Sequence, residues 1–333
     1  MKQNIIAISL LSTVFLATHA TAAGYSAFSP YQDVTINAHW DSKTNSMQPM
    51  SLLPVSEAGH INSYHLAFIT DAGSCQPAWG AQSSYAVSAK WGTQLTDSLR
   101  ANEIAYIVSF GGASGDDISK ACSEAQLIAA LDQVMQTYQP QGLDFDIENG
   151  STNVPKLMQA LSQFQNHYPT TSLSFTLPVL PEGLTGEGKS VVLKAKESGL
   201  NFHVNIMAMD FGPAYTNDMG EYAIQAATAL NQFLTSLYPE KSPEAIWGMI
   251  EVTPMIGVND VNVEQFTLTN ADTLRRFASK NALGGLSMWS VMRDHPCADH
   301  WASPICSGND LQKTPYEFAR MFVGLIDRKN NNS

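Results

Sequence analysis

The stretch Gly142–Glu148, near the middle of the chain, places the tightest constraint on the fold. Read as a β-strand, it puts Asp144, Asp146 and Glu148 on one face and three apolar side chains on the other. In an enclosed space, desolvation and like charge raise carboxyl pKa values, so the row predicts a protonated carboxyl near neutral pH. A solvated acidic edge strand, or a site of oxygen ligands for Mg²⁺ or Ca²⁺, is the alternative.

Apolar strand-like runs alternate with helical patterns along the rest of the chain. Several runs contain few charges, which is typical of strands covered on both faces. Eight such runs with intervening helices predict an α/β fold, a (β/α)₈ TIM barrel in a single domain. A doubly wound open sheet is the alternative, but no Gly-x-Gly-x-x-Gly follows a first strand, so a nucleotide site lacks support.

The expected strands are Val34–His39, Tyr64–Thr70, Ile104–Phe110, Leu143–Glu148, Leu173–Val179, Phe202–Asp210, Ile246–Val252 and Leu286–Trp289. The clearest helical patterns are Glu124–Tyr138, Pro155–His167, Ser190–Ser198, Met219–Leu237, Asn262–Lys280 and Pro315–Ile326. Ser123 and Gln126 form the pattern of a capping box, and Asn153 with Pro155 suits an N-cap followed by a first-turn proline.

The first 22 residues have the pattern of a secretory signal peptide. One lysine precedes the apolar run Ile5–Ala17, and small residues follow at Ala20–Ala22. The run is too short for a convincing membrane span. We therefore expect cleavage after residues 1–22, one domain over residues 23–328 and a disordered polar tail over residues 329–333. The mature protein is expected to be exported, either to the periplasm or to the extracellular space, and to be a monomer without a membrane span.

The charge and the cysteines exclude some classes of partner. A formal net charge of −12 argues against nucleic acid and anionic membranes as partners. Four cysteines in an exported protein indicate disulfides. Cys297 and Cys306 bracket a short loop and are paired here, which leaves Cys75 with Cys122. No Cys-x-x-Cys or His-Glu-x-x-His spacing supports zinc, and no metal or cofactor is expected.

Candidate site residues follow from the barrel geometry, because active sites of barrels gather at the C-terminal ends of the strands. Glu148 ends the fourth expected strand, Asp210 the sixth and Trp289 the eighth. The third ends at Ser109–Gly112, whose Gly111 and Gly112 would let the backbone approach a ligand, although a tight turn would also need glycine.

Four motifs resemble those of glycoside hydrolase family 18, the chitinase family. The family's fourth-strand pattern Asp-Gly-x-Asp-x-Asp-x-Glu corresponds to Gln141–Glu148, and its third-strand Ser-x-Gly-Gly to Ser109–Gly112. The sixth-strand motif corresponds to Met207–Gly212 and the eighth-strand tryptophan to Trp289. The resemblance extends from about residue 34 to residue 289, most of the expected mature chain.

The resemblance implies hydrolysis of β-1,4 linkages between N-acetylglucosamine units with retention of configuration. Glu148 would be the general acid and base, and the sugar's own 2-acetamido oxygen would attack the anomeric carbon. Asp146 would orient the acetamide, stabilise the positive charge that develops on it and share a proton with either neighbour. Asp144 would hold Asp146 and couple the titration of the cluster. Asp210 would hydrogen-bond the distorted sugar or its N-acetyl group from across the pocket, and Trp289 would form the hydrophobic floor beneath that sugar. The substrate-binding set implied is Asp210, Met209, Trp289, Ser109, Gly111, Gly112, Trp40 and Tyr215.

Two departures from the family pattern stand out. Gln141 replaces the first Asp at the start of the strand, where little effect is expected. Many members also have a tyrosine close to the sixth-strand Asp, whereas Met209, Phe211 and Gly212 have no side-chain donor. Similar Met-Ala-Met-Asp forms occur in archaeal-type chitinases. Tyr215 or Tyr64 is the hypothetical source of the missing hydroxyl.

The short segment 254–262 lacks the insertion that family members with deep tunnels carry. An open cleft and mainly endo cleavage of chitin are therefore expected. Trp40, Trp79 and Trp91 are candidate stacking residues along that cleft, with core packing the stronger reading for Trp91.

Three other functions remain open. An endo-β-N-acetylglucosaminidase acting on N-glycans would share the acid and the acetamide mechanism. A non-catalytic chitin-binding lectin on the same barrel is less well supported, because such relatives commonly lose the catalytic glutamate and Glu148 is present. A metal-dependent hydrolase would use Asp144, Asp146 and Glu148 as ligands.

Overall fold

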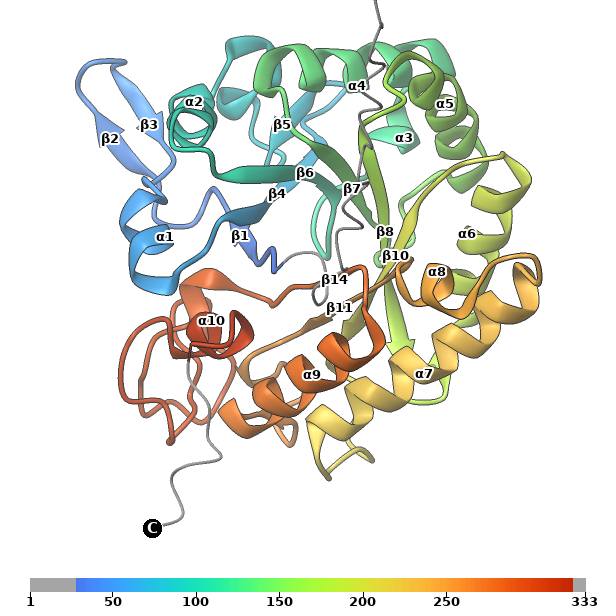
Figure 1. The fold of residues 1–333 in the computed structure, drawn as a ribbon. Helices are drawn as coiled ribbons and strands as arrows, with labels where there is room; N and C mark the ends of the chain where they lie inside the picture. Colours follow the sequence, from blue (N-terminus) through green and yellow to red (C-terminus); the bar gives the residue numbers. More distant parts are fainter. Residues whose placement is uncertain (1–27, 326–333) are drawn as a thin grey trace, which may run out of the picture.

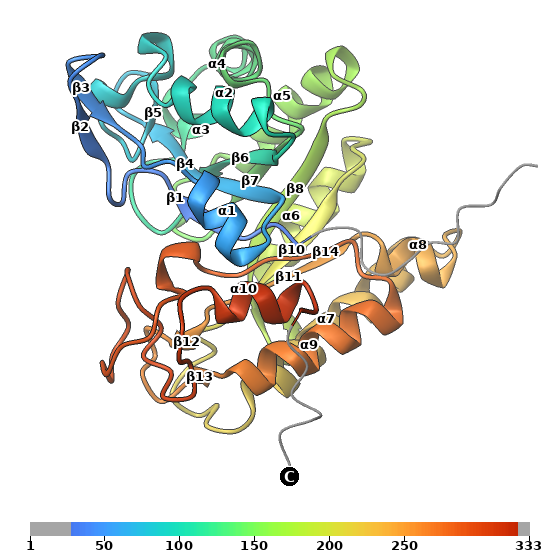
Figure 2. The same cartoon turned by 60° about the vertical axis from the view of Figure 1, so that its left-hand side comes forward.

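The computed structural model describes residues 28–325, so the expected signal peptide and polar tail lie outside the described residues. The described part is an α/β fold in which a parallel sheet curls round and helices lie along its outside (Figures 1 and 2). Within these residues no helix is both long enough and apolar enough to cross a membrane.

The main sheet has the strand order β1-β4-β6-β7-β8-β10-β11-β14, and each of these neighbours pairs in parallel. The strands rise in sequence order, as expected when each is followed by a crossover connection. Their bounds are β1 Tyr31–Asp33, β4 Ser63–Asp71, β6 Ala105–Gly111, β7 Gly142–Asp146, β8 Ser172–Leu180, β10 His203–Ala208, β11 Ile250–Pro254 and β14 Gly285–Leu286.

Short additional strands decorate the sheet or its loops. Two of them, β5 (Pro77–Trp79) and β9 (Gly183–Leu184), pair antiparallel with β4 and β8. The others form two hairpins, β2 (His39–Asp41) with β3 (Ser46–Gln48), and β12 (Gly257–Val258) with β13 (Gln265–Phe266).

The two ends of the sheet are joined by backbone hydrogen bonds. Phe28, just before β1, forms a parallel bridge with Leu286 of β14. The Ser29 N–H donates to the Leu286 carbonyl at 2.9 Å, and the Tyr31 N–H donates to the Met288 carbonyl at 3.0 Å. These contacts bring the first and last strands of the curl together.

The helices follow the expected pattern most closely where their caps are encoded locally. The expected spans Glu124–Tyr138 and Met219–Leu237 are confirmed as α4 and α7. The capping box of Ser123 and Gln126 is confirmed, as is the N-cap Asn153. The bounds are α1 Leu53–Gly59, α2 Thr93–Ala101, α3 Ile118–Ala121, α4 Glu124–Tyr138, α5 Val154–His167, α6 Gly186–Glu197, α7 Met219–Leu237, α8 Pro243–Trp247, α9 Leu268–Asn281 and α10 Glu317–Phe322, with 3₁₀ turns at Ser83–Tyr85, Val87–Ala89 and Val291–Arg293.

Two expected strands were misplaced. The first is Tyr31–Asp33 rather than Val34–His39, because the Asp33 carboxylate accepts hydrogen bonds from Thr35 and turns the chain. The seventh begins at Ile250 rather than Ile246. Ser242 caps a short helix there, with a proline in its first turn, and Ile246 belongs to that helix.

The starts of two helices and the ends of three strands were also wrong. The helix expected from Ser190 begins at Gly186, and the strand expected to end at Trp289 ends at Leu286. The helix expected from Asn262 begins at Leu268, because Thr267 caps it. Strand β7 stops at Asp146 and β10 stops at Ala208, so Glu148 and Asp210 lie two residues beyond their strands.

Alternation along β7 separates the core from the polar interior. Leu143 and Phe145 are buried among apolar side chains, and the Phe145 ring stacks on Phe110 with centroids 5.3 Å apart. Asp144 and Asp146, which alternate with them, are buried at 0% and 5% exposure. Strand β7 therefore carries its carboxylates inside the curl and its apolar side chains toward the helices.

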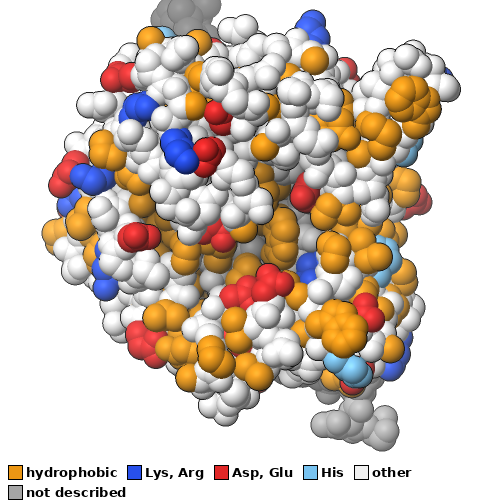
Figure 3. Space-filling model, turned by 180° about the vertical axis from the view of Figure 1, so that it is seen from behind, with side chains coloured by type: hydrophobic (Ala, Val, Ile, Leu, Met, Phe, Trp, Pro, Cys, Tyr) orange, Lys and Arg blue, Asp and Glu red, His pale blue; other side chains and the backbone are white. Residues whose placement is uncertain are grey.

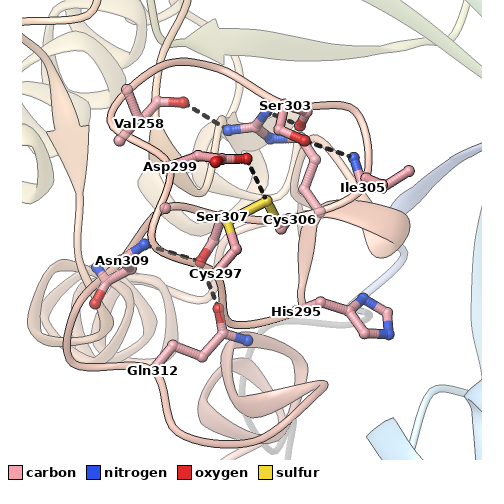
Figure 4. Close-up of a disulfide and its surroundings, with 12 residues drawn as sticks. Val258, His295, Cys297, Asp299, Ser303, Ile305, Cys306, Ser307, Asn309 and Gln312 are labelled. Carbon is pink, nitrogen blue, oxygen red and sulfur yellow. Dashed lines mark hydrogen bonds between the residues drawn. A yellow bond between two sulfur atoms is a disulfide. The ribbon is translucent and has the colours of Figure 1, made fainter.

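The two expected disulfides, Cys75–Cys122 and Cys297–Cys306, are confirmed. Figure 4 shows the second, which closes a short loop beside the β12–β13 hairpin.

Candidate functional site

Asp144 lies at the bottom of the carboxylate row and accepts hydrogen bonds from four hydroxyl groups. The register of the sheet sets Ser109 of β6 and Ser174 of β8 beside it. The Asp144 Oδ2 atom accepts from Tyr31 at 2.9 Å and from Ser109 at 2.5 Å. Its Oδ1 atom accepts from Ser174 and Thr176, both at 2.7 Å. Four donors match the acceptor capacity of a carboxylate, which explains how this side chain is fully buried.

Asp146 and Glu148 form a hydrogen-bonded pair of carboxyl groups above Asp144. Burial raises the pKa of Asp146 well above its usual range, and the charges of Glu148 and Asp144 raise it further. Glu148 is open to solvent at one side but crowded by protein, and this desolvation raises its pKa as well. The hydrogen bond raises the pKa of Asp146 and lowers that of Glu148, so the pair holds its first proton mainly on Asp146.

A cavity of about 180 Å³ lies over this pair. Aromatic rings line part of it: Trp289 stacks on Phe68 with centroids 5.7 Å apart, and Tyr31 lies 6.1 Å from Trp289. The complete lining is Tyr31, Phe68, Ala113, Asp146, Glu148, Thr176, Met207, Met209, Asp210, Thr253, Met255, Asp260 and Trp289. Figure 3 shows a face of the molecule on which acidic and hydrophobic side chains border a recess.

Asp210 enters the cavity from the loop after β10. Its Oδ1 atom accepts a hydrogen bond from the backbone N–H of Val261 at 2.8 Å. Burial raises the pKa of Asp210, and the charge of Asp260 adds to this. The Val261 N–H and the positive charge of Arg293 oppose the increase. A cavity lined by both aromatic rings and carboxyl groups suits a sugar ring, whose faces are apolar and whose edges carry hydroxyl groups.

Comparison with known proteins places the chain in a family. The chain is similar to the catalytic domain of a hyperthermophilic chitinase from Pyrococcus furiosus, with 33% identity and a TM-score of 0.79. The match covers 90% of this chain and 96% of that domain. The chain belongs to glycoside hydrolase family 18, the chitinase family. The resemblance inferred from the four motifs is thereby confirmed, although no family model matches the chain.

Two curated relatives are longer than this chain. A probable bifunctional chitinase/lysozyme of Escherichia coli K12 is 31% identical over 326 residues, covering 89% of this chain and 34% of that protein. Endochitinase 11 of Metarhizium anisopliae is 32% identical over 298 residues, covering 81% of this chain and 53% of that protein. The chain therefore spans between a third and about half of these two relatives.

Five of the expected site residues in this family 18 chain meet at the cavity: Asp146, Glu148, Met209, Asp210 and Trp289. Ser109 does not. Its side chain is fully buried and its hydroxyl donates to Asp144, so its placement as a substrate-binding residue is wrong. Asp144 also differs in detail from the expectation. Its hydrogen bonds go to hydroxyl groups rather than to Asp146, and it acts on Asp146 through its charge.

Backbone conformation and close packing explain why the residues at and just after the end of β6 are glycines. Gly111 has φ +90°, and a Cβ there would lie 2.1 Å from the Asp146 carbonyl oxygen. Gly112 has φ +89°, and its Cβ would lie 2.9 Å from the ring of Phe68. Close approach of the neighbouring strand and ring therefore requires both glycines. Their contact with substrate stays a prediction.

The expected aromatic residues lie in several places. Trp40, on the β2–β3 hairpin, is 60% exposed and lies outside the cavity lining. Trp79 is buried and its indole donates to Tyr138, so it is not a stacking residue. Trp91 is buried, and core packing is confirmed. The role of Trp40 as a stacking residue stays a prediction.

The missing tyrosine hydroxyl does not come from Tyr64. That residue lies near the start of β4, is fully buried, and its hydroxyl bonds to Ser56. Tyr215 also lies outside the cavity lining, and its hydroxyl donates to Glu182 at 2.9 Å. Tyr215 as the donor to an acetamide stays a prediction.

Several cavity residues were missed, and most of them carry no local sequence signal. Tyr31 was placed before the first expected strand, and Asp260 stands in a loop without a motif. Met207 could have been found, because it belongs to the same motif as Met209 and alternates with it.

A larger cavity of about 990 Å³ lies at the opposite end of the sheet. Residues at the starts of strands line it, among them Ser63, Ala105 and Ser172, and none of the three central carboxylates contributes. Its size alone therefore does not make it the site of this chemistry.

In residues 28–325, one group of three side chains, Cys297, Asp299 and Cys306, has atoms close enough to share a metal ion. The two cysteines are joined in a disulfide, so neither supplies a thiolate. This group does not suit a metal ion.

Proposed function

We propose that the chain is a chitinase that hydrolyses β-1,4 linkages between N-acetylglucosamine units, with Glu148 as general acid and base. The observation that carries the proposal is the pairing of Glu148 with a buried Asp146 in a cavity that is also lined by aromatic rings. The raised pKa values favour retention of one proton on this pair, which is what a general acid needs. The chitinase names of the similar proteins support the same substrate class.

In the first step, Glu148 gives its proton to the glycosidic oxygen as the bond from that oxygen to the anomeric carbon breaks. The 2-acetamido oxygen of the sugar forms a bond to the same carbon, so no second carboxylate acts as nucleophile. In the second step, the Glu148 carboxylate takes a proton from water as that water attacks the anomeric carbon. The bond from the acetamide oxygen to this carbon breaks, which restores the free acetamido group. Two inversions retain the configuration.

In this proposal Asp146 binds and orients the acetamide of the sugar. Its Oδ1 atom has no hydrogen-bond partner among the described residues, so the carboxyl group can rotate to accept the acetamide N–H. As Asp146 rotates, it passes its proton to Glu148, which is then protonated and can act as the general acid. The Asp146 carboxylate, now negatively charged, then stabilises the positive charge that develops on the acetamide. Asp210 binds the sugar from the opposite wall, and Trp289 forms the floor.

We also propose that the sheet closes into a (β/α)₈ barrel in a single domain and that the protein is exported. The hydrogen bonds from Ser29 and Tyr31 to the chain at β14 support closure. The two disulfides support an oxidising compartment. The short segment between β11 and α9 supports an open cleft and endo cleavage.

The test is incubation of the purified protein with soluble chitin oligomers and, separately, with an N-glycoprotein. Glu148→Gln is expected to lower turnover by about 10²–10⁴-fold while the fold is kept. Glu240→Gln, an exposed substitution in the loop after α7, is the matched control and should retain full activity. NMR of the first product should show the β-anomer.

Each contrary outcome has a distinct meaning. Parental activity in Glu148→Gln would refute the catalytic assignment. Cleavage of the glycoprotein alone would make the chain an endo-β-N-acetylglucosaminidase, and chitin binding without cleavage would make it a lectin. Loss of activity in a strong chelator would support a metal-dependent hydrolase instead. Exclusive early release of disaccharide would contradict endo cleavage.

A further inference from the structure

Arg293 is a buried cation beside the cavity that the proposed mechanism does not use. It ends the 3₁₀ turn Val291–Arg293 and is 2% exposed. Its Nη2 atom donates to the carbonyl oxygens of Ile256 at 2.9 Å and of Val258 at 2.6 Å, and its Nη1 atom donates to the Ser303 carbonyl. The planar guanidinium thus joins the chain after β11 to a second loop, as a fork of donors can.

That second loop is closed by the disulfide Cys297–Cys306, and Ser303 lies within it (Figure 4). Immediately after the disulfide, the carbonyl of Ser307 accepts from the Val258 N–H at 2.8 Å. The two chains approach so closely that a Cβ at Gly257 would lie 1.8 Å from the Ser307 carbonyl oxygen. The loop and residues 256–261, here called the wall segment, are therefore locked together.

The wall segment reaches the cavity directly. Asp260 lines the cavity, and the next residue, Val261, donates its backbone N–H to the Oδ1 atom of Asp210. A chain of contacts therefore runs from the disulfide through Arg293 and the wall segment to Asp210, which binds the sugar in the proposed function.

The charge of Arg293 acts on the same residue. No carboxylate lies within ion-pair distance of its guanidinium in the part of the chain described, and carbonyl oxygens alone do not neutralise a buried cation. Burial lowers the pKa of Arg293 to about 10, and the charges of Asp260 and Asp210 oppose this. The positive charge of Arg293 also lowers the pKa of Asp210. Burial and the negative charge of Asp260 raise that pKa.

We propose that Arg293, held in place by the Cys297–Cys306 loop, is a positioning residue for Asp210. It fixes the wall segment that hydrogen-bonds Asp210 and supplies a positive charge that acts on Asp210 among the carboxyl groups of the cavity. The role in turnover rests on the proposed chitinase function.

The charged and titratable groups that act on Asp210 define the expected pH effect. Asp260 and Arg293 act on it through their charges, and Glu148 and Glu264 interact with it in turn. Removing the one positive charge in this group raises the pKa of Asp210. The acidic limb of the kcat/KM profile should then move to higher pH, because the ionised Asp210 carboxylate is the form proposed to bind the sugar, and a charged acceptor bonds hydroxyl groups more strongly than a neutral carboxyl group does.

The experiment compares Arg293→Met, Arg293→Lys and the double variant Cys297→Ser/Cys306→Ser on soluble chitin oligomers across pH. Arg293→Met should lower kcat/KM by about 10–100-fold, since small misplacements have effects of this size, and should move the acidic limb upward. Arg293→Lys keeps the positive charge but loses the planar set of guanidinium donors. The acidic limb of its kcat/KM profile should therefore stay near the parental position while kcat/KM itself falls. The double cysteine variant should raise KM more than it lowers kcat.

The matched control is Cys75→Ser/Cys122→Ser, which removes the other disulfide and should leave both the pH profile and KM unchanged. A folded Arg293→Met variant with the parental acidic limb would overturn the proposal. If Arg293→Met does not fold, parental KM and kcat/KM in both Arg293→Lys and the Cys297/Cys306 variant would overturn it equally.

A second readout separates this inference from the proposed function. The titration of Asp210 can be followed by ¹³C NMR of labelled carboxyl groups, assigned with Asp210→Asn, in protein that hydrolyses nothing. An upward shift of the Asp210 pKa in Arg293→Met supports the charge role even if chitin is not the substrate, and an unchanged pKa refutes it.

Discussion

At the scale of single residues, the surroundings of the three carboxyl groups of the row, rather than their chemistry, make them differ in hydrogen bonding and pKa. Asp144 is surrounded by four hydroxyl donors and serves as a fixed acceptor. Asp146 is equally deep but has one oxygen without a partner among the described residues, and its pKa is raised by burial and by neighbouring charge. Glu148 stands at the open side of the cavity, where a substrate can reach it. Only the last two are suited to move a proton.

Asp260 tunes the pH dependence of its neighbours. Its negative charge raises the pKa of both Glu148 and Asp210. In Asp260→Asn both pKa values fall, so both limbs of the kcat/KM profile should move to lower pH. The alkaline limb moves because the proposed general acid, Glu148, must be protonated, and the acidic limb moves because Asp210 is proposed to bind the sugar in its ionised form. Steady-state kinetics across pH measures this, with exposed Asp116→Asn as control, and an unshifted profile would refute it.

At the scale of the elements, the geometry of the site depends on how closely β6 and β7 approach. Ser109 pairs with Asp144 and Gly111 with Asp146, so one register sets both the hydroxyl donor and the height of the carboxyl pair. A slip of one residue would turn the carboxylates of β7 toward the helices. The glycine at the end of β6 makes the close approach possible.

Gly111→Ala tests this dependence. Its Cβ would overlap the Asp146 carbonyl, and its φ of +90° is strained for alanine. We expect the free energy of unfolding to fall by about 2–5 kcal/mol from overpacking and backbone strain. Turnover should also drop in the folded fraction, because Asp146 is displaced. The control is Gly186→Ala at the start of α6, where a Cβ meets nothing within 4 Å. Equal urea midpoints for the two variants would contradict the prediction.

At the scale of the whole molecule, two disulfides tie loops to the curled sheet at different sequence distances. Cys75–Cys122 spans 47 residues and Cys297–Cys306 spans 9. The entropy that a crosslink removes from the unfolded chain grows with the length of the closed loop. The longer bridge should therefore contribute more to stability, and the shorter one more to the shape of the cavity wall.

Replacing each pair by serine measures the difference. The chain-entropy estimate is about 4 kcal/mol for Cys75–Cys122 and about 2.5 kcal/mol for Cys297–Cys306. Urea unfolding should show the larger loss for the first pair, and steady-state kinetics the larger change in KM for the second. The reverse order in stability would show that native-state contacts, rather than loop length, dominate.

The sequence by itself determined the features that local chemistry encodes. Strict alternation over Gly142–Glu148 set which side chains enter the interior, because the period of a strand is two. Caps such as Ser123 and Asn153 marked helix starts, since they satisfy backbone N–H groups in place. Four cysteines allow only three disulfide pairings, so the short spacing of Cys297 and Cys306 was enough to choose one. The motifs of family 18 occur along the chain in the order of the strands that carry them.

Only the tertiary structure decided which distant residues meet. Tyr31 and Asp260 lie more than a hundred residues to either side of Glu148 in the chain. No local pattern marks them, because curling of the sheet alone brings them to the cavity. Ser109 changed from an expected sugar contact to a donor for Asp144 through strand register. Arg293 acquired its place near Asp210 through carbonyl contacts between two loops, an arrangement that periodicity does not encode.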